Sequence, residues 1–196
     1  MILPGMNTTV EPAAASETSA FSEEGELPRT CADITIDDDR WLSVAGLMDL
    51  IPGLAAEALR AAGLSPESCS VSIALLSDAE VHSLNKAFRG KDAPTNVLSF
   101  PSSASVHTGG RKADPLFLGD VALAYETVAG EASAQDKAVL HHAAHLVVHG
   151  VLHLAGFDHD GDAAAERMEG AERAILGRFG IPDPYEDDAA SLANVL

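Results

Sequence analysis

The chain has 196 residues, 46% of them hydrophobic and 21% charged, and its formal net charge at pH 7 is −18. This length accommodates one substantial domain, and the apolar content excludes a wholly disordered chain. The most apolar stretch, residues 45–64, is broken by charged residues and a proline, which excludes a membrane span. Cys31 and Cys69 form no CxxC pair, which excludes a disulfide framework and a cysteine zinc knuckle. We therefore expect a cytoplasmic protein in a reducing compartment.

The acidic residues are concentrated toward the two ends of the chain. Residues 1–28 contain five acids and no base, and residues 182–196 contain four acids and no base. Because residues 1–28 also lack apolar periodicity, we predict a disordered acidic extension there, a single domain at 29–182 and an acidic tail at 183–196. Within the domain, the segment from Lys86 to Lys112 is the one basic segment, with a local charge of +4.

The predicted elements alternate between strand and helix. Alternating apolar residues indicate strands, whereas capping residues and apolar spacings of three and four indicate helices. In chain order, the sequence predicts a strand at 34–36, a helix at 42–64 interrupted at Pro52 and Gly53, a strand at 69–76, a helix from 78 to about 89, a strand at 97–100, a hairpin-like excursion at 102–115, a strand at 117–124, a helix at 135–155 and a helix from about 162 to 179. We predict an α/β fold of the α+β type, with a small mixed sheet packed by helices.

The helix predicted at 135–155 carries most of the histidines. It is apolar almost all round, so we expect it to be buried. His149 and His153 are spaced i and i+4, which places both imidazoles on one face, about one turn apart. Gly156 allows the chain to turn back, so that His159 completes a three-histidine site with a fourth position open to water. This pattern predicts a zincin-like site that holds one Zn²⁺ per chain.

The same spacing occurs in zinc proteases, but Gly150 stands where those enzymes need their general-base glutamate. Peptide hydrolysis by that route is therefore not expected. His145 competes as a ligand, but a 145/149/153 set would lie along one straight edge, so we interpret His145 as a supporting or solvated residue. Asp120 and Asp158 are candidates for orienting a ligand histidine, with a structural hydrogen bond as the alternative.

Three ordered blocks form recognisable motifs. They are LNKAFRGKDAPTNVLSFP at 84–101, LGDV at 118–121 and HGVLHLAGFDH at 149–159. These blocks resemble the signatures of the YbeY-type endoribonucleases, which are bacterial rRNA maturation factors. The resemblance extends from about Ile34 to Ile181, with Phe157 standing where many members have Tyr.

The resemblance implies a single-domain α/β fold in which three histidines bind zinc. It further implies cleavage of single-stranded RNA during 16S rRNA 3′-end maturation and ribosome quality control. The expected partners are rRNA, the small ribosomal subunit and a small-subunit ribosomal protein, with no membrane.

Arg89 matches the family's functional arginine beside the metal. A guanidinium can clamp phosphate oxygens and offset charge in the transition state. The alternatives for Arg89 are an ion pair with Asp92 and a role in bracing its loop. Four other basic residues could follow an RNA backbone or could be ordinary surface residues. They are Lys86, Lys91, Arg111 and Lys112.

Two other functions stay open at this point. One is a different metal-dependent hydrolase, such as a peptidase with another base. The other is a non-enzymatic ribosome-assembly protein whose metal braces the fold. The acidic net charge fits direct RNA binding poorly, and recognition through a ribosomal protein would resolve that conflict.

Overall fold

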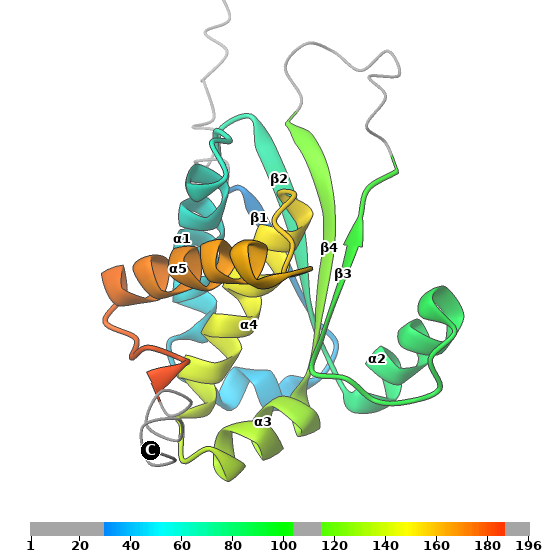
Figure 1. The fold of residues 1–196 in the computed structure, drawn as a ribbon. Helices are drawn as coiled ribbons and strands as arrows, with labels where there is room; N and C mark the ends of the chain where they lie inside the picture. The colour runs from blue at the N-terminus through cyan, green and yellow to red at the C-terminus, as the bar shows by residue number, and fades with distance from the viewer. Residues whose placement is uncertain (1–29, 104–114, 187–196) are drawn as a thin grey trace, which may run out of the picture.

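A computed structural model describes residues 30–103 and 115–186. Its centre is a four-stranded sheet in the order β1 (Ala32–Ile36), β2 (Cys69–Leu76), β4 (Leu116–Ala124) and β3 (Val97–Pro101). The first three strands in this order are parallel, and β3 pairs antiparallel with β4 at one edge (Figure 1). The predicted α/β fold with a small mixed sheet is thus confirmed.

Helices cover both faces of this sheet. On one face lie α1 (Leu47–Ala61), α4 (Val139–Leu154) and α5 (Asp162–Arg178), with α4 between the sheet and α5 (Figure 1). On the other side lies α2 (Asp78–Leu84), and α3 (Tyr125–Ala134) continues directly from β4. Two short helices complete the described part, a 3₁₀ helix at Asp39–Ser43 and a π-helical turn at Asn85–Arg89.

The sheet separates two apolar clusters. Alternate residues of a strand point to opposite faces, so Ile73 and Val121 join α1 and α4 in the main core. Ala122 and Ala124 of β4 face a smaller cluster with Val81 of α2. As predicted, α4 is largely buried, because the sheet, α1, α3 and α5 all pack against it.

Several element boundaries differ from the sequence prediction. Pro52 does not interrupt a helix but lies inside α1, where its missing N–H removes a single hydrogen bond near the N-terminus. The break falls earlier, at Gly46, between the 3₁₀ helix and α1. The predicted helix at 78–89 changes to π-helical geometry after Leu84. Helix α3 was not predicted, because only Val128 and Ala132 of its ten residues are buried.

Part of the sequence prediction concerns residues outside the described ranges. These are the acidic extension at 1–28, the tail residues 187–196, and the segment 104–114 with Arg111 and Lys112. Among the helices of the described ranges, none combines the length and the apolar character needed to span a membrane.

Candidate metal centre

The structure brings the three predicted ligand histidines together. His149 and His153 lie on successive turns of α4, and His159 follows the turn that ends this helix. Gly156 adopts a φ of 93° in that turn, as its predicted role requires. The N–H of Phe157 donates to the carbonyl of Leu152 at 2.9 Å, which folds the chain back over the end of α4. One candidate ligand atom from each histidine lies within 4.8 Å of the others.

Hydrogen bonds to Nδ1 of His149 and His153 determine that Nε2 of each ring faces the three-histidine cluster. His149 Nδ1 lies 2.9 Å from a carboxylate oxygen of Glu172, and His153 Nδ1 lies 3.1 Å from the carbonyl oxygen of Phe157. Both partners accept hydrogen bonds, so each Nδ1 carries the proton. The two Nε2 atoms then present lone pairs to each other at 3.1 Å. Two facing lone pairs repel unless a cation lies between them, so this arrangement favours a bound metal ion.

The geometry and chemistry of the cluster fit zinc. Two imidazole nitrogens at tetrahedral positions around zinc are roughly 3.3 Å apart, close to the separation of the Nε2 atoms of His149 and His153. Burial, helped by the neighbouring His149, lowers the pKa of His153, which keeps this ring neutral and able to donate its lone pair. His159 is exposed, so the site opens to solvent on its side.

Arg89 shares a cavity with these histidines. The cavity has a volume of about 570 Å³ and is lined by Arg89, by β3 residues including Ser99, and by His149, His153 and His159. The Arg89 Nη2 group donates to the Ser99 carbonyl at 3.0 Å, and the Ser99 hydroxyl donates to the Gly150 carbonyl at 3.3 Å. Ser99 thereby connects the guanidinium to the helix that bears the histidines.

The ion pair between Arg89 and Asp92, one alternative to a functional role for Arg89, is absent from the described part of the chain. Asp92 instead accepts from Lys86 at 2.8 Å and lies 2.7 Å from His82 Nε2, and these two partners lower its pKa. Loop bracing, the other alternative for Arg89, is present as the bond to Ser99. Lys91 is exposed on the turn after Arg89, outside the cavity lining.

Sequence reasoning missed Glu172, a carboxylate of α5 that lies behind the histidines. Its side chain is 0% exposed and accepts from His149 through one oxygen and from His145 and Tyr185 through the other. Burial alone would raise the pKa of Glu172, but the hydrogen bonds from His145 and His149 outweigh it and hold the pKa at about 2. One sequence signal was available: Glu172 lies four residues after Met168 and three before Ile175, a helical spacing that places it on the same face of α5 as these two apolar residues.

The three residues predicted to support the ligands have different positions. His145 does lie behind His149, since both rings bond to Glu172. Asp158 accepts from the backbone N–H of His159 at 2.8 Å, so it shapes the turn. Asp120 is exposed on β4, and no hydrogen bond within 30–103 and 115–186 joins it to an imidazole. Glu172 lies behind a ligand histidine, in the position expected for Asp120.

Packing explains the glycine that replaces the protease glutamate. A Cβ atom on Gly150 would lie 2.6 Å from Val121 Cγ1 and 3.2 Å from Ser99 Oγ. The first distance is far below van der Waals contact, so α4 could not approach the sheet this closely with a side chain at position 150. A general-base glutamate is sterically incompatible with this arrangement of α4 on the sheet.

Known proteins are similar in sequence to this chain over most of its length. The sequence model of the family described as Endoribonuclease YbeY matches residues 35–180. An endoribonuclease YbeY of Azorhizobium caulinodans is 49% identical over 154 residues, which cover 78% of this chain and 94% of that protein. A second, from Rhodopseudomonas palustris, is 41% identical over 172 residues and covers 87% of this chain and 89% of that protein.

A solved structure supports the fold independently. The solution structure of a Thermotoga maritima protein superimposes with a TM-score of 0.50 at 24% identity, covering 76% of this chain and 91% of that one. The residues that the family model matches include Arg89 and the three clustered histidines. The chain therefore belongs to the endoribonuclease YbeY family of nuclease hydrolases.

Proposed function

We propose that this protein is a cytoplasmic, zinc-dependent endoribonuclease that cleaves single-stranded RNA in 16S rRNA 3′-end maturation and ribosome quality control. The observation that carries the proposal is one open cavity lined by both His149, His153 and His159 and the guanidinium of Arg89. A phosphodiester group needs a cation for its oxygens and an activated nucleophile close by, and this cavity has residues suited to both tasks.

The residues of the cavity have two different roles, metal binding and phosphate binding. His149, His153 and His159 would hold one zinc ion, which when bound acts as a Lewis acid and lowers the pKa of water to about 7. Arg89 binds the non-bridging phosphate oxygens with its planar fork and offsets the negative charge that grows on them. The bond to Ser99 limits the orientations of the guanidinium, so that less entropy is lost when phosphate binds.

The shape of the site favours a single strand. The cavity is a pocket of about 570 Å³ between β3 and the end of α4. A flexible single strand can place one phosphodiester group between Arg89 and the histidines, whereas a duplex holds its phosphates on a rigid helix.

The charge of the molecule supports a role on the ribosome. A net charge of −18 repels free RNA at long range, so electrostatic steering cannot supply the affinity. Contacts with a small-subunit ribosomal protein would provide it and would bring the enzyme to rRNA within the small ribosomal subunit. Lys86, Lys91, Arg111 and Lys112 are then proposed as local backbone contacts.

One experiment tests the catalytic proposal. Purified protein is assayed for metal content and for cleavage of a labelled single-stranded RNA and of the same sequence as a duplex, before chelation, after chelation and after zinc is restored. We expect about one zinc per chain and cleavage of the single strand that chelation abolishes and zinc restores. Full cleavage by metal-free protein would contradict the proposal, and cleavage of a peptide library instead of RNA would support the alternative hydrolase.

The rRNA step needs a separate test in cells that lack the endogenous enzyme. We expect 16S precursors with extended 3′ ends, which the parent protein corrects and His153→Ala does not. Equal correction by both proteins would leave only the assembly-factor alternative.

A further inference from the structure

Glu172 is a fully buried charge at the interface between α5 and α4. An ionised carboxylate is costly to bury unless several donors compensate it. Three donors do so here, the ring N–H groups of His149 and His145 and the hydroxyl of Tyr185. An apolar side chain would fill this position at lower cost, so packing alone does not account for the carboxylate.

The bond from His149 sets the direction of that ring. Because Nδ1 of His149 donates to Glu172 at 2.9 Å, rotation of the ring about the Cβ–Cγ bond would break a charge-assisted hydrogen bond. The opposite nitrogen, Nε2, is thereby directed toward Nε2 of His153. A carboxylate behind a histidine also raises the basicity of the nitrogen that binds the metal.

The second oxygen of Glu172 accepts a hydrogen bond from the segment Ile181–Glu186, which follows α5. Tyr185 in this segment donates to Glu172 Oε2, which His145 also approaches at 2.9 Å. Burial and the adjacent carboxylate raise the pKa of Tyr185, so its hydroxyl stays protonated and donates. Glu172 therefore links Tyr185, on one oxygen, to His149 on the other.

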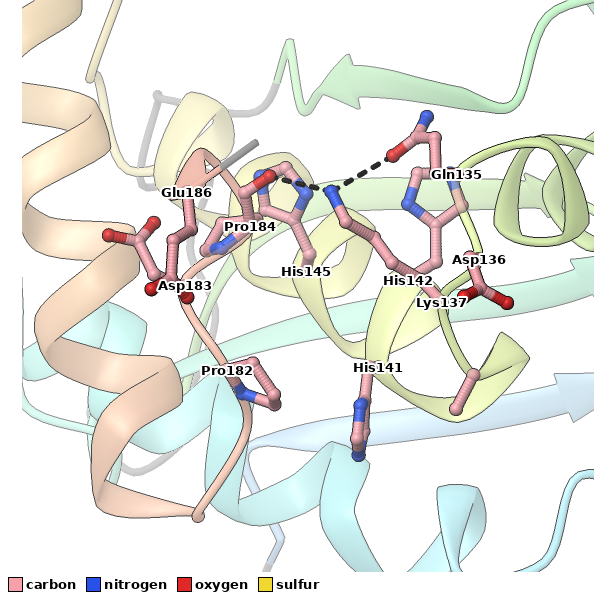
Figure 2. Close-up of a pocket in the computed structure, with 11 residues that line it drawn as sticks. Gln135, Asp136, Lys137, His141, His142, His145, Pro182, Asp183, Pro184 and Glu186 are labelled. Carbon is pink, nitrogen blue, oxygen red and sulfur yellow. Dashed lines mark hydrogen bonds between the residues drawn. The ribbon is translucent and has the colours of Figure 1, made fainter. Parts of the chain in front are cut away.

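Contacts on either side of Tyr185 keep the segment in place. The Lys137 ammonium donates to the Pro184 carbonyl at 2.8 Å and to the Gln135 side chain at 3.0 Å (Figure 2). These residues line a cavity of about 450 Å³, which His145 also lines. The Arg173 guanidinium pairs with Asp183 at 3.2 Å and lies 4.8 Å from the centre of the Tyr185 ring. The segment is thus fixed both to the start of α4 and to α5.

We propose that Tyr185 and Glu172 are positioning residues for the metal ligand His149, so that the segment Ile181–Glu186 is a functional part of the metal centre. The inference rests on the proposed metal ligands and extends them by a chain of contacts from Tyr185 through Glu172 to His149. It assigns the segment a role in metal affinity, in addition to any contribution to folding.

The test compares the zinc affinity of full-length variants by competition with a chromophoric chelator. Tyr185→Phe removes one hydroxyl and should weaken zinc binding about three- to tenfold, and Glu172→Gln should weaken it about 10- to 100-fold. Tyr125→Phe removes the other tyrosine hydroxyl of the chain, and Glu166→Gln removes an exposed carboxylate of α5. Both controls should retain the parent affinity.

A spectroscopic readout separates positioning from a purely structural role. In the cobalt-substituted protein, the visible absorption bands report ligand geometry. They should change in Tyr185→Phe and Glu172→Gln and stay the same in the controls. A structural role alone would lower the melting temperature of the metal-free variants and leave both affinity and spectrum unchanged.

The outcomes separate this inference from the proposed function. Parent protein that binds no zinc overturns the metal proposal together with this one. Parent protein that binds zinc while Tyr185→Phe keeps the same affinity and cobalt spectrum overturns the inference alone, whatever Glu172→Gln does. Because Tyr185→Phe changes a single hydroxyl, it gives an answer even if Glu172→Gln does not fold.

Discussion

Ser99 contributes a carbonyl to Arg89 and a hydroxyl to Gly150, the residue next to His149. The phosphate-binding and metal-binding groups are therefore connected by two hydrogen bonds through one residue. Since these bonds are local, losing the guanidinium should leave the histidines in place. Mutations at the two groups should then produce different defects.

The first prediction concerns Arg89. Arg89→Ala should keep about one zinc per chain and the parent fold while cleavage of single-stranded RNA falls by about 10²–10³-fold, as expected when one transition-state donor is lost. Arg89→Lys should rescue poorly, because it keeps the charge without the planar fork. Metal analysis and cleavage at matched metal content in low salt provide the measurements, and parent-level cleavage by Arg89→Ala would falsify the assignment.

The second prediction concerns the metal ligands. His153→Ala should lose stoichiometric zinc and RNA cleavage together, because two imidazoles hold zinc far more weakly than three. His82→Ala is the matched control, since His82 lies on α2, pairs with Asp92 and does not line the cavity. Elemental analysis that finds full zinc in His153→Ala would show that the ligand set is wrong.

The ligands could be predicted from sequence because their geometry is local. An i, i+4 pair on one helix and a glycine-permitted turn determine the positions of His149, His153 and His159 within eleven residues. Glu172 lies on another helix, and its contact with His149 exists only after α5 packs against α4. The spacing of Glu172 with apolar residues of α5 indicates a buried charge that needs a hydrogen-bond partner, but the sequence does not show that the partner is His149.

At the scale of elements, the close approach of α4 to the sheet is the feature that positions the site. Gly150 removes the side chain that would separate α4 from Val121 of β4. This approach also lets the Gly150 carbonyl accept from Ser99 on the edge strand. The close packing of α4 on the sheet therefore also sets the position of the histidines relative to Ser99 and Arg89.

The third prediction tests this packing. Gly150→Ala should destabilise the fold by about 1–3 kcal/mol, because overpacking outweighs the gain in helix propensity. Gly170→Ala in α5 adds the same methyl group, but to open space, and should stabilise by up to about 1 kcal/mol. Urea unfolding of both variants checks the prediction. Equal effects of the two substitutions would show that the α4 contact has no such role.

Element types were predictable where the pattern is strong. Most residues of β2 alternate between buried and half-buried, which gives the period of two expected of a strand. The apolar residues of α4 recur at spacings of three and four, because the helix is buried by several neighbouring elements. Helix α3 carries too few buried residues for a periodic signal, so only its packing against α4 reveals it. The place of β2 between β1 and β4 depends on long-range parallel pairing, which local patterns do not encode.

At the scale of the whole molecule, α4, α5 and the segment Ile181–Glu186 meet around one buried carboxylate, Glu172. A ligand that binds only the folded state stabilises the whole cooperative unit, by an amount that rises with the logarithm of the free ligand concentration above its dissociation constant. Zinc should therefore affect global unfolding as well as the local site.

The fourth prediction follows from this coupling. Zinc at about 100 times its dissociation constant should stabilise the fold by about 2.7 kcal/mol, and chelation should remove that gain. Thermal unfolding of metal-free and zinc-loaded protein measures the shift. His153→Ala should show none, and a shift as large as that of the parent would mean that zinc acts at another site.

The order of the residues along the chain gives the Tyr185 contact a consequence for biosynthesis. A ribosome produces the N-terminal residues first, so Arg89 and all three ligand histidines are made before Glu172, and Glu172 before Tyr185. On our inference, a nascent or prematurely terminated chain that stops short of Tyr185 contains the complete set of ligands but binds zinc more weakly than the finished chain. An enzyme that cuts RNA would thus gain its full metal affinity only after the last positioning residue has been added, which limits the activity of unfinished copies beside the ribosome that makes them.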